Sequence, residues 1–132
     1  MGEHRFEIGF FPGVWDLLHN GHIKALKEAR EKCDYLIVGV NKNPTDKKPI
    51  LTVDERVELL EAVRWWDEIK IYEDDDELYR LDKKPFFHVR FVGADHKEID
   101  HEINAEVVKI SRNHNYSTTN LKKRIHEHFL QS

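Results

Sequence analysis

A continuous apolar segment between residues 34 and 40 constrains the fold of this chain more than any other feature. It reads Asp34-Tyr-Leu-Ile-Val-Gly-Val40 and shows no alternation with polar residues. Such runs are typical of strands covered on both faces, and therefore of parallel sheets wrapped by helices. An apolar, aromatic segment at 6–11 precedes it, and residues 22–33 between the two carry their apolar side chains on one helical side. These three pieces predict a strand-helix-strand unit with parallel strands.

The same alternation continues to the end of the chain. Thr52, followed three positions later by an acidic residue, predicts the start of a helix that runs to Trp65 or Trp66. We expect strands over 69–72, 87–92 and 105–110, and the acidic run 73–77 either caps a short helix or lies in solvent. Residues 117–120 start a final helix through Ile125 and Phe129. The prediction is an α/β fold, a Rossmann-like three-layer sandwich with a mostly parallel central sheet, formed by residues 1–132 as a single domain.

Charge and hydropathy limit the classes of partner. The 21 Lys and Arg residues against 25 Asp and Glu give a net charge of −4, which offers no general attraction for nucleic acid or anionic lipid. The longest apolar run is far shorter than the roughly 20 residues that a membrane span needs. The amino terminus lacks the apolar region of a secretory signal, and the single cysteine, Cys33, cannot form an internal disulfide. We therefore expect a cytoplasmic protein that binds neither nucleic acid nor membrane.

The segments that follow the predicted strands are where chemistry is expected, because ligands of parallel sheets bind beyond the carboxyl ends of the strands. One of them contains His19-Asn-Gly-His22 at the start of the first helix. Histidines three positions apart share a helical face, and the backbone N–H groups and dipole of a helix start suit a phosphate chain. Two imidazoles there can stabilise phosphoryl oxygens in nucleotidyl transfer. One histidine could instead cap the helix while the other packs, and a zinc site lacks a third ligand at sensible spacing.

Four segments together resemble the cytidylyltransferase family. Gly13-Val-Trp-Asp-Leu-Leu-His-Asn-Gly-His22 is similar to the family's G-T-F-D-L-L-H-x-G-H signature. Residues 34–40 are similar to its second strand, Arg64-Trp-Trp-Asp-Glu-Ile69 to its R-Y-V-D-E-V segment, and residues 112–119 to its R-T-x-G-I-S-T-T segment. The matches come in the family's order, and the chain has the size of the small bacterial glycerol-3-phosphate cytidylyltransferases.

The resemblance implies a reaction and a set of site residues. The reaction is transfer of CMP from CTP to a phosphorylated alcohol, most of all glycerol 3-phosphate, which releases pyrophosphate and forms CDP-glycerol. Mg²⁺ would accompany the nucleotide, no protein metal ligand is expected, and the protein would be a homodimer. Catalytic roles fall to His19, His22, Lys47 and Arg112. Nucleotide binding falls to Pro12, Gly13, Val14, Trp15, Asp16, Gly21, Gly93, Asp95, Ser117, Thr118 and Thr119. Substrate binding falls to Lys47, Arg64 and Asp67.

Departures from the family pattern keep other hypotheses open. Val14 replaces a threonine, Thr45 a lysine, and Asn115 and Tyr116 a glycine and an isoleucine. The alternatives are a phosphoethanolamine or phosphocholine cytidylyltransferase, an adenylyltransferase that uses a sugar or flavin phosphate, and a nucleotide-binding sensor without turnover. The residues also have ordinary explanations: solvated lysines at 47 and 48, a helix cap at 117–119, and a pair of tryptophans, 65 and 66, that fill the core or a subunit contact.

Overall fold

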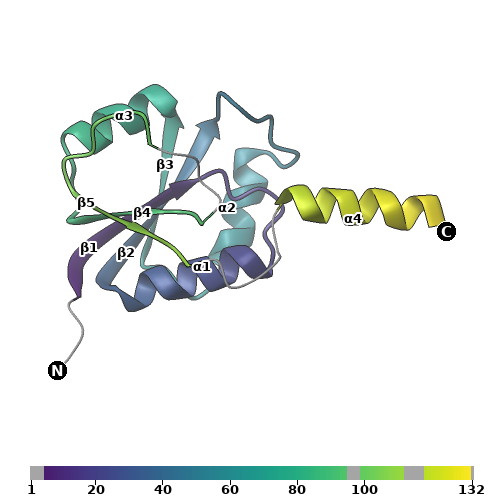
Figure 1. Cartoon of the computed structure of the whole chain (residues 1–132), viewed down its shortest axis with the longest axis horizontal. Coiled ribbons are helices and arrows are strands. Elements are labelled where there is room, and N and C mark those ends of the chain that lie inside the picture. Colours follow the sequence, from purple (N-terminus) through teal and green to yellow (C-terminus); the bar gives the residue numbers. More distant parts are fainter. Residues whose placement is uncertain (1–4, 95–98, 112–117, 132) are drawn as a thin grey trace.

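The computed structural model describes residues 5–94, 99–111 and 118–131, which alternate between strands and helices along the chain (Figure 1). In order these elements are β1 (Phe6–Gly13), α1 (Asn20–Glu31), β2 (Cys33–Asn43), α2 (Val53–Glu61), β3 (Glu68–Asp74), α3 (Asp75–Lys83), β4 (Val89–Val92), β5 (Glu106–Lys109) and α4 (Thr118–Gln131).

The strands form one five-stranded sheet in the order β3-β2-β1-β4-β5. Every pair of neighbouring strands is parallel. The chain moves outward from β1 to β3 and then crosses back to place β4 on the other side of β1. The prediction of a Rossmann-like sandwich is confirmed, and the sheet is wholly parallel. The strand order reverses between β1 and β4, so ligands are expected beyond the carboxyl ends of these two strands.

Helices cover both faces of the sheet, with α1 on one side and α3 on the other (Figure 1). On the first face, α1 and α2 pack against a core that includes Phe11 and Val38. On the second face, α3 packs against Phe10 and Ile37. Because successive strand residues point to opposite faces, a strand covered on both sides must be apolar at every position. This is the physical reason for the unbroken apolar run in β2.

Helix α2 begins where the sequence predicts and ends earlier. Thr52 forms the expected capping box, in which its hydroxyl accepts from the N–H of Glu55 and the Glu55 carboxylate accepts from the N–H of Thr52. The helix stops at Glu61 instead of continuing to Trp65 or Trp66. The indole of Trp66 donates to the carbonyl oxygen of Leu60 at 2.7 Å. The same carbonyl oxygen also accepts from the N–H of Val63 at 2.9 Å, so it is satisfied without a further turn of helix. Trp65 and Trp66 pack against the core, which confirms one of the two explanations offered for them.

The acidic run 73–77 caps helix α3, as one of its two interpretations predicted. The carboxylate of Asp74 accepts from the N–H of Glu77 at 2.9 Å, and acidic side chains occupy the first turn. Negative charge there is stabilised by the helix dipole. The described residues contain no cluster of three or more His, Cys, Asp or Glu side chains placed to hold a metal ion. Within the described ranges, no helix is long and apolar enough to cross a membrane.

Candidate active site

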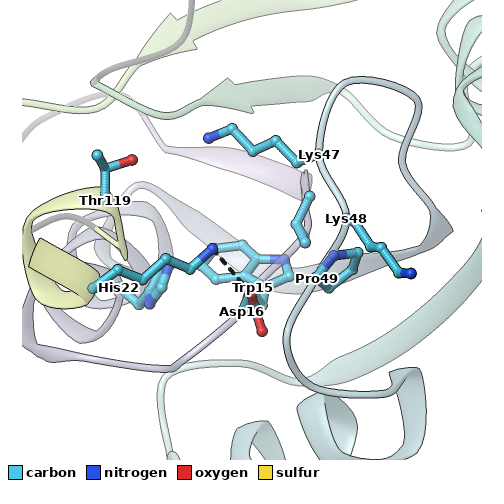
Figure 2. A pocket seen from close by; sticks show the side chains of 9 residues that line it. Trp15, Asp16, His22, Lys47, Lys48, Pro49 and Thr119 are labelled. Carbon is cyan, nitrogen blue, oxygen red and sulfur yellow. Dashed lines mark ion pairs between the residues drawn. The ribbon is translucent and has the colours of Figure 1, made fainter. Parts of the chain in front are cut away.

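A cavity of about 490 Å³ opens at the carboxyl edge of the sheet, where the fold predicts a ligand site. Its volume is within the range of small-molecule sites, about 300–1,000 Å³. The lining comes from the segment after β1, the first turn of α1, the loop between β2 and α2, and the beginning of α4 (Figure 2). The described lining residues are Val14, Trp15, Asp16, His22, Lys47, Lys48, Pro49, Thr119 and Lys122. Three lysines against one carboxylate make the cavity suited to an anion.

The two histidines of the His-x-Gly-His motif cap the start of α1 together. His19 is the N-cap residue, and its Nδ1 atom accepts from the N–H of Gly21 at 3.0 Å. The Nδ1 atom of His22 accepts from the N–H of His19 at 3.2 Å. The rings stack with their centroids 4.0 Å apart. The motif is therefore a capping box in which histidine occupies both positions that usually hold Ser or Thr and Glu or Gln.

This capping box determines which ring nitrogen of each histidine carries a proton. A backbone N–H can donate only to a ring nitrogen that has no hydrogen, so Nδ1 is the acceptor in both rings. The neutral imidazoles then carry their proton on Nε2. His22 lines the cavity, and its Nε2–H can donate to an oxyanion there, whereas His19 is not part of the described lining. Capping and ligand binding, two alternatives at the sequence level, are thus compatible for His22.

The loop between β1 and α1 has a strained backbone that Trp15 holds in place. Trp15 and Leu17 have positive φ angles of 56° and 50°, a conformation that costs a residue with a side chain roughly 1–2 kcal/mol. The buried indole of Trp15 donates to the carbonyl oxygen of Gly39 at 2.8 Å and packs edge-on against Phe11. A Cβ atom at Gly13 would lie 3.1 Å from this indole, so glycine makes room for the ring.

Asp16 joins this loop to the loop that carries the lysines. The side chain is buried, with 6% of the residue exposed. Its two carboxylate oxygens accept from the N–H groups of Ile50 and Leu51, at 2.9 and 3.0 Å. Asp16 was predicted to bind nucleotide, and the structure adds that it positions the end of the lysine loop.

Arg56 is a second buried connection, which the sequence analysis missed. Its guanidinium group donates to the carbonyl oxygens of Val14 at 2.8 Å, Asn41 at 2.7 Å and Leu51 at 3.2 Å, so one side chain links three segments around the cavity. Burial lowers the pKa of Arg56, and the nearby Asp16 carboxylate opposes that shift. A signal was present in the sequence, because Arg56 shares the apolar face of α2 with Val57 and Leu60.

The other residues that the sequence analysis named lie in different places. Lys47 and Thr119, which were predicted as site residues, line the cavity together with Lys48, which was named only as a solvated lysine. Pro12 and Gly13 end β1, Gly21 is buried in the first turn of α1, and Gly93 follows β4, with none of these four in the described lining. Thr118 begins α4. Asp95, Arg112, Asn115, Tyr116 and Ser117 lie outside the described residues. Thr45 is turned toward α3, since its N–H donates to the Asp75 carboxylate at 3.3 Å.

Arg64 and Asp67 lie at the amino edge of the sheet. The Asp67 carboxylate accepts from the N–H of Leu36 at 2.7 Å and pairs with Arg30 at 2.8 Å, while the Arg64 guanidinium lies over the Trp65 ring. Leu36 is seven positions before Asn43, the end of β2, which corresponds to about 23 Å along a strand that rises about 3.3 Å per residue. Within one chain the structure therefore does not bring these two residues to the cavity, and their role in substrate binding stays a prediction.

Comparison with known proteins gives a consistent family. The model of a family described as cytidylyltransferase-like matches residues 10–126. The bifunctional protein HldE of Nitrobacter winogradskyi is 35% identical over 136 residues, covering 92% of this chain and 28% of the relative. HldE of Rhodopseudomonas palustris is 36% identical over 130 residues, covering 89% and 26%. The chain thus spans little more than a quarter of the length of these relatives.

A solved structure shares the fold. The lipopolysaccharide core biosynthesis protein from Thermoplasma volcanium superposes with a TM-score of 0.68 and 24% sequence identity, over 85% of this chain and 99% of that protein. At this identity the likeness concerns the fold alone. Because the family model matches residues 10–126, most of the sequence, the chain belongs to the cytidylyltransferase-like family.

Proposed function

We propose that this chain transfers a nucleotidyl group from a nucleoside triphosphate to a phosphorylated small molecule and releases pyrophosphate. The observation that carries the proposal is the cavity at the carboxyl edge of the sheet, which joins His22 to three lysines. A triphosphate is a chain of anionic oxygens, and this arrangement supplies both positive charge and a fixed N–H donor for it.

The reaction would be an in-line displacement. An oxygen of the acceptor's phosphate forms a bond to the α-phosphorus, the bond from that phosphorus to the bridging oxygen breaks, and its electron pair leaves with pyrophosphate. Because charge builds on phosphoryl oxygens, positioning and electrostatic stabilisation suffice, and no protein nucleophile is needed. The Nε2–H of His22 donates to such an oxygen, His19 orients His22 through the shared cap, and Lys47 and Lys48 neutralise the phosphate chain.

The specific reaction we propose is transfer of CMP from CTP to glycerol 3-phosphate, supported by the four matching sequence segments and by the family. A second candidate is transfer of a nucleotidyl group, AMP included, to a sugar phosphate. It stays open because the chain departs from the cytidylyltransferase pattern at Val14 and Thr45. We also propose that the chain forms a homodimer and acts in the cytoplasm.

Mg²⁺ fits the site as an ion that arrives with the nucleotide. Asp16 is the one carboxylate in the described lining, and both of its oxygens already accept from backbone N–H groups. Mg²⁺ commonly keeps several waters and is bound by one or two carboxylates together with substrate phosphates. Because both Asp16 oxygens are engaged, the ion would be held by the phosphate oxygens of the nucleotide and by water, and it would supply further neutralisation of phosphate charge.

The test is a matrix of donors and acceptors. The purified chain is incubated with CTP or ATP and with glycerol 3-phosphate, phosphocholine, phosphoethanolamine, sugar 1-phosphates or flavin mononucleotide, and pyrophosphate release and product mass are measured. We expect CDP-glycerol from CTP and glycerol 3-phosphate. Activity with ATP and a sugar phosphate alone would establish the second candidate. Nucleotide binding without pyrophosphate from any pair would overturn catalysis in favour of a nucleotide sensor.

A further inference from the structure

Lys122, near the start of α4, contributes to the cavity a cation that no sequence motif indicated. We propose that Lys122 is a further phosphate-binding residue of this site, held at the cavity by Asp16 until the phosphate chain of the nucleotide replaces that carboxylate as its partner. The inference rests on the proposed function and specifies which element completes the phosphate site.

The geometry directs the ammonium group of Lys122 into the cavity. Its Nζ atom lies 4.0 Å from Oδ2 of Asp16, the ion pair marked by the dashed line in Figure 2. The Lys122 side chain is 43% exposed, whereas that of Asp16 is 7% exposed. The carboxylate thus lies at the base of the cavity, and the ammonium group stays accessible to a ligand.

The ion pair between Lys122 and Asp16 is weak enough for a phosphate chain to replace the carboxylate. An ion pair at this distance with a half-exposed lysine is weak, because water screens it and the long side chain loses freedom. Asp16 does not depend on it, since both carboxylate oxygens accept from the N–H groups of Ile50 and Leu51. A phosphate chain offers more negative charge and more acceptor oxygens than this engaged carboxylate. Transfer of Lys122 to phosphate is therefore favourable and leaves Asp16 satisfied.

The arrangement places cations on two sides of the cavity. Thr119 of α4 lies on one side in Figure 2, and Lys48 and Pro49 of the lysine loop lie on the other. Asp16 contacts both elements, through Lys122 and through the backbone of the loop. Lys122 would thus bind the phosphate chain from the α4 side, opposite Lys47 and Lys48.

A matched control lies at the next position. Lys123 is exposed, carries the same charge on the same helix and does not line the cavity. One residue corresponds to about 100° around a helix, so the two side chains point in different directions. Lys122→Ala and Lys123→Ala remove the same charge and change the helix propensity equally. A difference in ligand affinity between the two variants therefore measures the effect of the position of the lysine.

The experiment measures dissociation constants of inorganic tripolyphosphate, CTP, ATP and the nucleoside cytidine at two salt concentrations, for the wild type and for Lys122→Ala, Lys122→Arg and Lys123→Ala. We expect Lys122→Ala to weaken binding of tripolyphosphate and of the preferred triphosphate about tenfold, and to reduce the salt dependence of binding. Cytidine binding should change less than twofold. Lys123→Ala should stay within twofold of the wild type, and Lys122→Arg should recover most of the affinity.

Two results would overturn the inference: equal affinities for Lys122→Ala and Lys123→Ala, or an equal loss for cytidine and tripolyphosphate, which would indicate a packing role. These outcomes are separable from failure of the proposed function. A wild type that binds tripolyphosphate and loses it on Lys122→Ala, yet produces no pyrophosphate with any acceptor, supports Lys122 and refutes the reaction. A wild type that binds no phosphate compound refutes both.

Discussion

The carboxyl edge and the amino edge of the sheet both gather cationic side chains, and the two edges differ in what those cations face. At the amino edge, Arg30 pairs with Asp67 and donates to the carbonyl oxygen of Cys33, and Arg5 donates to the same oxygen. At the carboxyl edge, Lys47 and Lys48 line a cavity and make no ion pair among the described residues. Cations that bind carboxylate or carbonyl groups of the protein stabilise the fold, whereas cations that line a cavity are available to a ligand.

The largest expected effect at the carboxyl edge is on turnover. His22→Ala removes a fixed N–H donor, and we expect kcat to fall by about 10²–10³, the scale for losing one preorganised donor. His19→Asn is the control, because asparagine is itself a good N-cap acceptor and should preserve the start of α1. Steady-state pyrophosphate release measures both variants. A near-normal kcat for His22→Ala would remove the catalytic role of the motif.

The second effect compares one arginine at each edge, Arg56 buried and Arg30 half-buried, by the free energy of unfolding. Arg56→Met leaves the carbonyl oxygens of Val14 and Asn41 without their donor, and we expect a loss of about 3 kcal/mol together with reduced activity. Arg30→Met removes a half-buried pair with Asp67 and should cost about 1 kcal/mol without changing kcat. Urea denaturation and kinetics on the folded variants give both quantities. Equal losses of unfolding free energy in Arg56→Met and Arg30→Met would show that the two edges do not differ in this respect.

Asp67 tests the comparison most directly, because the family resemblance assigns it to substrate binding. Asp67→Asn weakens the bond from the Leu36 N–H and the pair with Arg30, for which we expect a loss of about 1 kcal/mol in unfolding free energy. From its place at the amino edge we expect unchanged kcat and KM. A raised KM for the acceptor would mean that this edge contributes to a site, and the comparison would fail.

The smallest effect concerns Cys33, at the amino edge. Burial raises the pKa of its thiol to about 11, from 9.0. A raised folded pKa stabilises the protein below the pKa of the unfolded thiol, and that contribution is lost as the pH rises from about 9 to 11. We expect slow alkylation of the native protein at pH 8, and a loss of stability above pH 9 that is smaller in Cys33→Ala. Rapid labelling of the folded protein would contradict the buried assignment.

Local signals in the sequence predicted the fold and much of the site. The capping box at Thr52 and the cap at Asp74 each depend on residues three positions apart, so a linear pattern contains them in full. The buried arginine was also detectable, because Arg56 occupies an apolar-face position of α2, where a charged side chain must find partners. Its partners were not detectable, since Val14 and Asn41 belong to other segments.

By itself the sequence determined the alternation of strands and helices, the parallel sheet and the segments beyond its carboxyl edge, because hydrophobic period and caps act over a few residues. Only the tertiary structure decided that Lys122 reaches the cavity while Arg64 and Asp67 lie at the opposite edge. Those outcomes depend on contacts between distant segments, such as the 106 positions that separate Asp16 from Lys122. Nothing in the local pattern of a solvated lysine distinguishes one that meets such a partner from one that meets water.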